Sequence, residues 1–132
     1  MSLVIIALGL NDFYNTNCVR TWASAQGIDR LLDLAANAPN DAGYPRPKML
    51  VLAPPPIDVR SAIYGERFDG ATERSQGLAE AYRQVAETKG AFCFNLGTVT
   101  TASAVDGVHL DEDQHERVAS AVAIEAARIL GL

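Results

Sequence analysis

Two short segments of the chain carry residue types that could perform acid–base chemistry and stabilise a developing negative charge. In the first, Asp106-Gly107-Val108-His109-Leu110, a carboxylate precedes an imidazole by three positions. On a turn, this spacing can bring the carboxylate to the imidazole Nδ1, which fixes the tautomer and leaves Nε2 free as a general base. The same spacing is also found in structural loops, where Asp forms a turn and His fills a gap. Taken alone, the pair leaves both interpretations open.

The second segment, Gly9-Leu10-Asn11-Asp12, follows an apolar run. Gly9 allows the backbone to turn sharply, and the Asn11 side-chain N–H₂ at a strand end can donate into a cleft, as an oxyanion-hole donor must. Because Asn and Asp favour turns for purely local reasons, an ordinary strand-to-loop turn is the alternative. His115 lies near the polar start of the last predicted helix, and we interpret it as a solvated helix residue.

Three apolar runs, over residues 3–8, 49–53 and 91–94, predict the strands that position these segments. The runs lack strict alternation, which is typical of parallel strands buried on both faces. Helical periodicity fills the intervals over residues 19–36 and 72–89 and returns near the C-terminus. There Asp111 can cap a helix, and Gln114 completes a capping-box pattern.

The resulting order β-α-β-α-β-α predicts an α/β three-layer sandwich with a parallel sheet, in one domain spanning residues 1–132. In open sheets of this kind, ligands bind beyond the carboxyl ends of the strands. The segments that begin at Gly9, Pro54 and Asn95 all follow predicted strands. We therefore expect them to share one rim of the sheet.

Composition and charge narrow the classes of partner. The chain has 16 acidic and 11 basic residues, a net charge of -5 and no basic run, which argues against nucleic acid and anionic membranes. Cys18 and Cys93 lie far apart without a metal-ligand spacing, so we expect neither a disulfide nor a metal site, and a reducing, cytoplasmic compartment. The absence of a Gly-rich phosphate loop after any predicted strand disfavours a flavodoxin-like nucleotide-binding module.

Taken together, the motifs resemble the SGNH (GDSL-type) hydrolase family. The run from Val4 to Asp12 is similar to the third sequence block of that family. The segments Val51–Pro56 and Asp106–His109 are most similar to those of small bacterial acyl-esterases and arylesterases. The resemblance extends over essentially the whole chain. It implies a flavodoxin-like SGNH fold and a serine-dependent hydrolase, or acyl transferase, that acts on small carboxylic esters without a cofactor.

The resemblance also implies roles for individual residues. Asn11 would be the side-chain donor of the oxyanion hole, and Gly9 would shape the turn that presents it. His109 would act first as general base and then as general acid. Asp106 would be the carboxylate that orients His109.

One departure from the family pattern concerns the nucleophile. The family carries its serine in a Gly-Asp-Ser block before the Gly-x-Asn-Asp block, and the 132 residues contain no Gly-Asp-Ser. Nothing in the sequence marks Ser61, Ser103, Thr100 or Thr101 as an activated substitute. We therefore expect an N-terminally truncated SGNH domain that lacks its first strands and is inactive as given.

The same departure predicts an exposed edge at the apolar run 3–8, beside which the family places its first strand. An unpaired apolar edge strand is a template for pairing with another chain, so we expect a homo-oligomer. A catalytically inactive structural or assembly domain, held together through this edge, is the alternative to an ester hydrolase.

Overall fold

A computed structural model describes residues 1–39, 43–59 and 64–132. Its centre is a parallel sheet of three strands in the order β1-β2-β3, formed by β1 (Leu3–Ile6), β2 (Lys48–Ala53) and β3 (Phe92–Asn95). Ile5 of β1 pairs with Leu50 of β2. The predicted α/β fold with a parallel sheet is confirmed, although β1 ends two residues earlier than the apolar run from which it was predicted.

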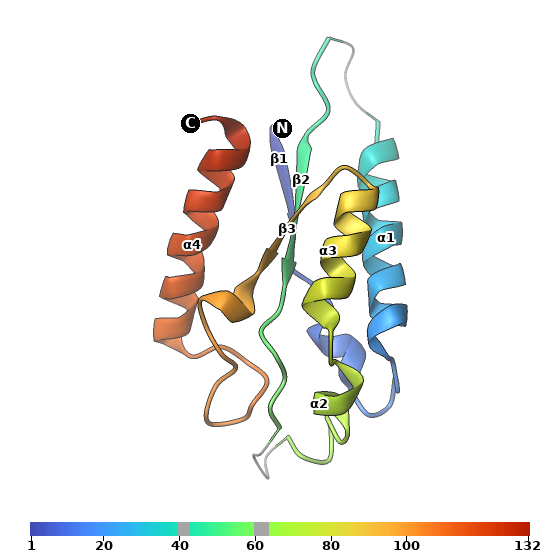
Figure 1. Cartoon of the computed structure of the whole chain (residues 1–132), viewed down its shortest axis with the longest axis vertical. Helices are drawn as coiled ribbons and strands as arrows, with labels where there is room; N and C mark the ends of the chain where they lie inside the picture. The colour runs from blue at the N-terminus through green and yellow to red at the C-terminus, as the bar shows by residue number, and fades with distance from the viewer. Residues whose placement is uncertain (40–42, 60–63) are drawn as a thin grey trace.

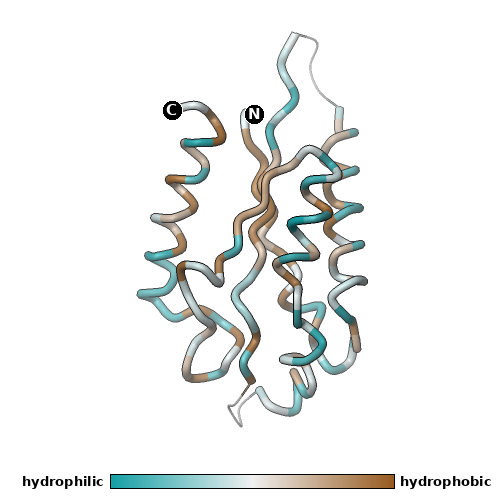
Figure 2. Tube along the Cα trace, in the orientation of Figure 1, coloured by the Kyte–Doolittle hydropathy of each residue, from teal (hydrophilic) through white to brown (hydrophobic). Residues whose placement is uncertain are grey.

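Helices cover both faces of the sheet (Figure 1). Helices α1 (Thr21–Asn37) and α3 (Leu78–Thr88) pack on one face, and α4 (Glu112–Leu130) covers the other. Two apolar clusters fill the resulting layers: one contains Leu32 and Tyr82, and the other contains Leu50 and Ile129. The hydrophobic colour in Figure 2 is accordingly concentrated along the strands.

The helix predicted over residues 72–89 is interrupted, which corrects the sequence prediction. The structure has a short helix α2 (Ala71–Arg74) followed by α3, which begins at Leu78. Gly77 between them adopts a left-handed conformation with φ 76°. A single glycine leaves apolar periodicity intact, so the pattern of apolar residues gave no sign of the break.

The start of α4 follows the prediction from its sequence. Asp111 and Gln114 form a capping box, in which the Asp111 backbone N–H donates to Gln114 Oε1 at 2.7 Å. The Ser103 hydroxyl donates to Asp111 Oδ1 at 2.8 Å. The beginning of the helix is thereby tied to the loop that precedes it.

The carboxyl ends of all three strands point to the same end of the molecule, the lower end in Figure 1. The 3-10 turn η1 (Leu10–Phe13) follows β1, the proline-rich segment follows β2, and a second 3-10 turn, η2 (Leu96–Thr98), follows β3. The loop that leads into α4 lies at this end as well. The fold therefore brings together the segments in which the sequence predicted chemistry.

Candidate active site

Asp106 and His109 are in direct contact. The Asp106 Oδ2 atom lies 2.8 Å from Nδ1 of His109. The other oxygen, Oδ1, accepts hydrogen bonds from the backbone N–H groups of Val108 at 2.8 Å and His109 at 2.9 Å. Asp106 is buried, whereas the His109 side chain is 51% exposed. The carboxylate is thus held by its own loop and presents one oxygen to an imidazole that faces the solvent.

The surroundings of Asp106 favour its charged form. Burial alone would raise the pKa of this carboxyl group, but the hydrogen bonds from the His109 side chain and from the backbone N–H groups of His109 and Val108 outweigh that effect. The pKa of Asp106 therefore lies below its ordinary value. A carboxylate only accepts hydrogen bonds, so Nδ1 of neutral His109 carries the proton and Nε2 is left unprotonated.

We expect His109→Ala to raise the pKa of Asp106, measured by NMR titration of its side-chain carboxyl carbon. His115→Ala, which removes the other histidine, is the matched control and should leave the titration in place. Because Asp106 has a lowered pKa in the folded state, its pairing stabilises the fold above the unfolded value of about 3.9. This contribution is lost as pH falls through the folded-state pKa. Identical Asp106 titrations in the parent and in His109→Ala would contradict the prediction.

Asn11 lies on the turn η1, which residues 7–9 separate from β1. Its backbone carbonyl accepts hydrogen bonds from the Tyr14 backbone N–H at 3.3 Å and from Nδ2 of Asn17 at 3.1 Å. The Asn11 side-chain amide makes no hydrogen bond to any residue in the described part of the chain. Gly9, with φ 115°, makes the turn possible. Asn11 is exposed, so its amide is a free donor at the end of the strand.

Asn11 and His109 line one cavity of about 710 Å³, which we call the His109 cavity. Apolar residues from the sheet, from α1 and from the proline segment form much of its wall, among them Ile28, Leu52 and Pro54. His115 also lines the cavity. The interpretation of His115 as a solvated helix residue is confirmed, since it is exposed in the first turns of α4, and its side chain also borders the same space as His109.

An aromatic group also contacts His109. The Tyr64 ring meets the imidazole edge to face, with centroids 5.2 Å apart and planes inclined by 66°. Phe68 packs on Tyr64 at 6.3 Å and on Tyr14 at 4.5 Å. Sequence analysis did not associate Tyr64 with the site, because no local pattern links it to a histidine 45 positions later.

The hydroxyl groups considered from the sequence do not form a second catalytic arrangement. Ser103 is buried, and besides donating to Asp111 its Oγ accepts the Val105 backbone N–H at 3.0 Å. The Thr100 hydroxyl donates to the backbone of Thr101 at 3.3 Å. Ser61 lies outside the described residues. The Ser103 hydroxyl is thus engaged by Asp111 and by its own loop, and the Thr100 hydroxyl by the backbone of the next residue.

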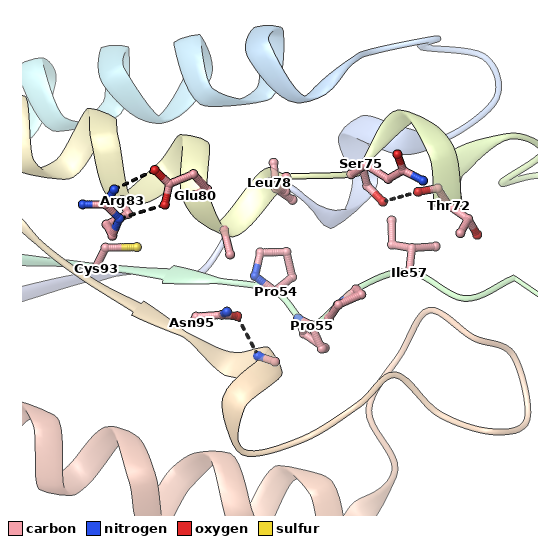
Figure 3. Close-up of a pocket in the computed structure, with 15 residues that line it drawn as sticks. Pro54, Pro55, Ile57, Thr72, Ser75, Leu78, Glu80, Arg83, Cys93 and Asn95 are labelled. Atoms are coloured by element: carbon pink, nitrogen blue, oxygen red, sulfur yellow. Dashed lines mark hydrogen bonds and ion pairs between the residues drawn. The ribbon is translucent and has the colours of Figure 1, made fainter.

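A second cavity, of about 600 Å³, lies between β3 and the α2–α3 segment (Figure 3). Its charged residues Arg83 and Glu80 pair with each other, and the Asn95 side chain accepts the backbone N–H of Gly97 at 2.9 Å. Burial raises the pKa of the Cys93 thiol to about 11, so Cys93 is not a thiolate nucleophile at neutral pH. The acid–base groups therefore favour the His109 cavity as the candidate active site.

Comparison with known proteins identifies the family of the chain. The family model for GDSL-like lipases and acylhydrolases matches residues 1–122. The chain belongs to the GDSL-like lipase/acylhydrolase family. No curated protein matches it significantly.

Solved structures of bacterial esterases share the fold of this GDSL-like chain. A protein of Agrobacterium tumefaciens assigned as an arylesterase is 36% identical, with a TM-score of 0.86. The carbohydrate acetylesterase Est24 of Sinorhizobium meliloti is 30% identical, with a TM-score of 0.89. The Mycobacterium smegmatis aryl esterase is 28% identical, also with a TM-score of 0.89. Each comparison covers 98% of this chain but only 61% or 62% of the other. The chain thus spans less than two thirds of their length.

The described helices of this GDSL-like chain include none that is both long and apolar enough to cross a membrane.

Proposed function

We propose that this chain carries the acid–base and oxyanion-stabilising part of a serine hydrolase that acts on small carboxylic esters. The observation that carries the proposal is the 2.8 Å contact between Asp106 and His109, at a cavity that Asn11 also lines. Family membership and the similarity to bacterial arylesterases and carbohydrate acetylesterases support this reaction class. Acyl transfer to an acceptor other than water would use the same groups.

In the proposed reaction, His109 Nε2 takes the proton from a serine hydroxyl as that oxygen attacks the ester carbonyl. The Asn11 amide donates to the carbonyl oxygen as it becomes an oxyanion. His109 then returns the proton to the departing alcohol, which leaves an acyl-serine, and water hydrolyses that ester by the same steps. Asp106 keeps His109 in the required tautomer throughout. The 132 residues do not supply this serine in a Gly-Asp-Ser block.

Labelling with a fluorophosphonate tests this division of roles. The 132-residue chain should remain unlabelled. A fusion in which a Gly-Asp-Ser segment precedes Leu3 should become labelled, and changing its serine to alanine should abolish the reaction. Rapid labelling of the 132-residue chain itself would show that a nucleophile is already present and would contradict the assignment.

The free edge of β1 favours the second candidate function, assembly with another copy of the chain. On this strand Ile5 is 44% exposed, and Leu8, just beyond it, is 58% exposed. An open cavity of about 420 Å³ lies along the edge, bounded by residues 4–8 and by Leu31 and Ala35 of α1. Pairing of two such edges would satisfy the backbone groups of β1 and bury these side chains.

We expect the 132-residue chain to form dimers through β1, and Ile5→Lys to reduce the mass measured by light scattering to that of a monomer. A lysine at this position would place a charge in the proposed interface. Ile124→Lys on α4, where the isoleucine is 73% exposed, is the matched control and should leave the dimer intact. A folded, monomeric parent chain at high concentration would contradict the proposal.

We also propose a cytoplasmic location, which the two free cysteines support. Cys18 is exposed and Cys93 is partly buried, and neither forms a disulfide. Unpaired cysteines are typical of proteins from reducing compartments.

A further inference from the structure

A buried chain of hydroxyl groups lies directly beneath the turn that carries Asn11. The Ser24 hydroxyl donates to Asp12 Oδ2 at 2.7 Å, and Ser24 Oγ lies 2.7 Å from the Tyr82 hydroxyl oxygen. Because the single Ser24 proton is directed to the carboxylate, Ser24 accepts from Tyr82; the Tyr82 hydroxyl also lies 3.4 Å from the Leu8 carbonyl oxygen, a longer contact than the 2.7 Å to Ser24. Tyr82 has no exposed surface and Ser24 is 2% exposed. The order of donation is therefore Tyr82 to Ser24 to Asp12.

These three side chains connect three separate elements. Tyr82 belongs to α3, Ser24 to α1, and Asp12 to η1, where it is the neighbour of Asn11. Burial raises the pKa of Tyr82 to about 12, so its hydroxyl keeps its proton at neutral pH. Asp12 and Ser24 also line the His109 cavity. The network thus joins both helices of one layer to the turn at the site.

Gly9 is packed closely against the same network. A Cβ atom at Gly9 would lie 1.9 Å from the Tyr82 hydroxyl oxygen and 3.2 Å from Ser24 Oγ. The Asp12 backbone N–H donates to the Gly9 carbonyl at 3.1 Å, which closes the turn between the two contacts. Two contacts therefore fix the position of the turn. Gly9 packs against the Tyr82 hydroxyl, and Asp12 accepts a hydrogen bond from Ser24.

We propose that Tyr82, Ser24 and Asp12 are positioning residues that set the orientation of the Asn11 side-chain amide toward the His109 cavity. Asn11 lies between Gly9 and Asp12, the two points at which the network holds the turn. Its own side chain has no hydrogen-bond partner in the described part of the chain, so the backbone of the turn, which sets the direction of the Asn11 Cα–Cβ bond, is what restricts the positions that the amide can reach. The functional meaning of this orientation rests on the proposed role of Asn11, whereas the orientation itself can be measured without activity.

NMR of the 132-residue chain tests the proposal. Tyr82→Phe and Ser24→Ala should each shift and broaden the side-chain amide resonances of Asn11. Ser75→Ala is the matched control, since Ser75 is also buried but bonds the backbone of Thr72 and lines the other cavity. It should change the urea midpoint without moving the Asn11 resonances. Unchanged Asn11 resonances in both Tyr82→Phe and Ser24→Ala would overturn the proposal.

A rescue experiment provides an independent readout. Gly9→Ala should lower the urea midpoint strongly, and Tyr82→Phe should recover part of that loss, because it removes the oxygen that the new Cβ would strike. Strictly additive effects of the two substitutions would overturn the contact between Gly9 and Tyr82. Should Gly9→Ala fail to fold alone, recovery of folding in the double variant supports the contact, and continued failure counts against it.

Kinetics separate the positioning role from the proposed function. In an active serine-bearing fusion, Tyr82→Phe should lower kcat about tenfold or more and leave KM within about twofold, since the oxyanion donor acts in the transition state. If the fusion is inactive while the Asn11 resonances respond as expected, the proposed function fails and the positioning network stands. If the fusion depends on Asn11 and the resonances do not respond, the network fails and the function stands.

Discussion

A chain in which a Gly-Asp-Ser segment is fused ahead of Leu3 should hydrolyse p-nitrophenyl acetate about 10³-fold or more faster than the 132 residues alone. In the proposed reaction His109 moves protons and Asn11 stabilises an oxyanion, but acyl transfer in this family requires a serine to carry the acyl group. Without that serine, His109 could only activate water. The segment needs two βα units, on the order of 60 residues, so that its nucleophile strand can pair with the free edge of β1.

The increase in rate should depend on both parts of the fused protein. Changing the new serine to alanine or His109 to alanine should return the rate to the level of the unfused chain. Asn11→Ala should reduce kcat by about 10²-fold, as expected for one oxyanion-hole donor. Turnover by the unfused chain well above an imidazole control, abolished by His109→Ala, would mean that a nucleophile is already present among the 132 residues.

Gly107→Ala should destabilise the fold by at least about 3 kcal/mol, measured by urea unfolding. Gly107 lies inside the Asp106–His109 segment with φ 73°, and an added Cβ would lie 1.8 Å from the Asp58 carbonyl oxygen. The Asp58 backbone N–H donates to the Gly107 carbonyl at 2.9 Å. Because the obstacle is backbone held by this hydrogen bond, side-chain rotation cannot relieve the clash.

Gly27→Ala is the matched control for Gly107→Ala. Gly27 lies within α1, and a Cβ atom there would have no neighbour within 4 Å. Alanine is favoured over glycine in a helix, so this change should increase the free energy of unfolding by up to about 1 kcal/mol. A Gly107→Ala protein as stable as the parent would show that the loop carrying His109 is not packed against Asp58 as described.

Much of the fold could be predicted from the sequence because its determining signals are local. Unbroken apolar runs predicted the strands, and their alternation with helical segments predicted the parallel sheet. The capping box at Asp111 and Gln114 was predicted because both groups lie within one helical turn. The interruption before α3 was not predicted, because a left-handed glycine such as Gly77 leaves the apolar pattern of its neighbours unchanged.

The candidate site was only partly accessible from the sequence. Asp106 and His109 are three residues apart, so a turn alone can bring them into contact. The contact of Tyr82 with Ser24 joins residues 58 positions apart, and nothing in either local sequence indicates the other. Such contacts depend on how α1 and α3 pack on the sheet, which periodicity does not determine.

The tautomer of neutral His109 tests most directly whether Asp106 and His109 form one acid–base pair. Long-range ¹H–¹⁵N correlation of the labelled 132-residue chain, at a pH where the ring is neutral, distinguishes the protonated ring nitrogen from the bare one. We expect the proton on Nδ1 and a bare Nε2, and we expect Asp106→Asn to remove this preference. A proton on Nε2 in the parent chain, unaffected by Asp106→Asn, would contradict the assignment of His109 as a general base oriented by Asp106.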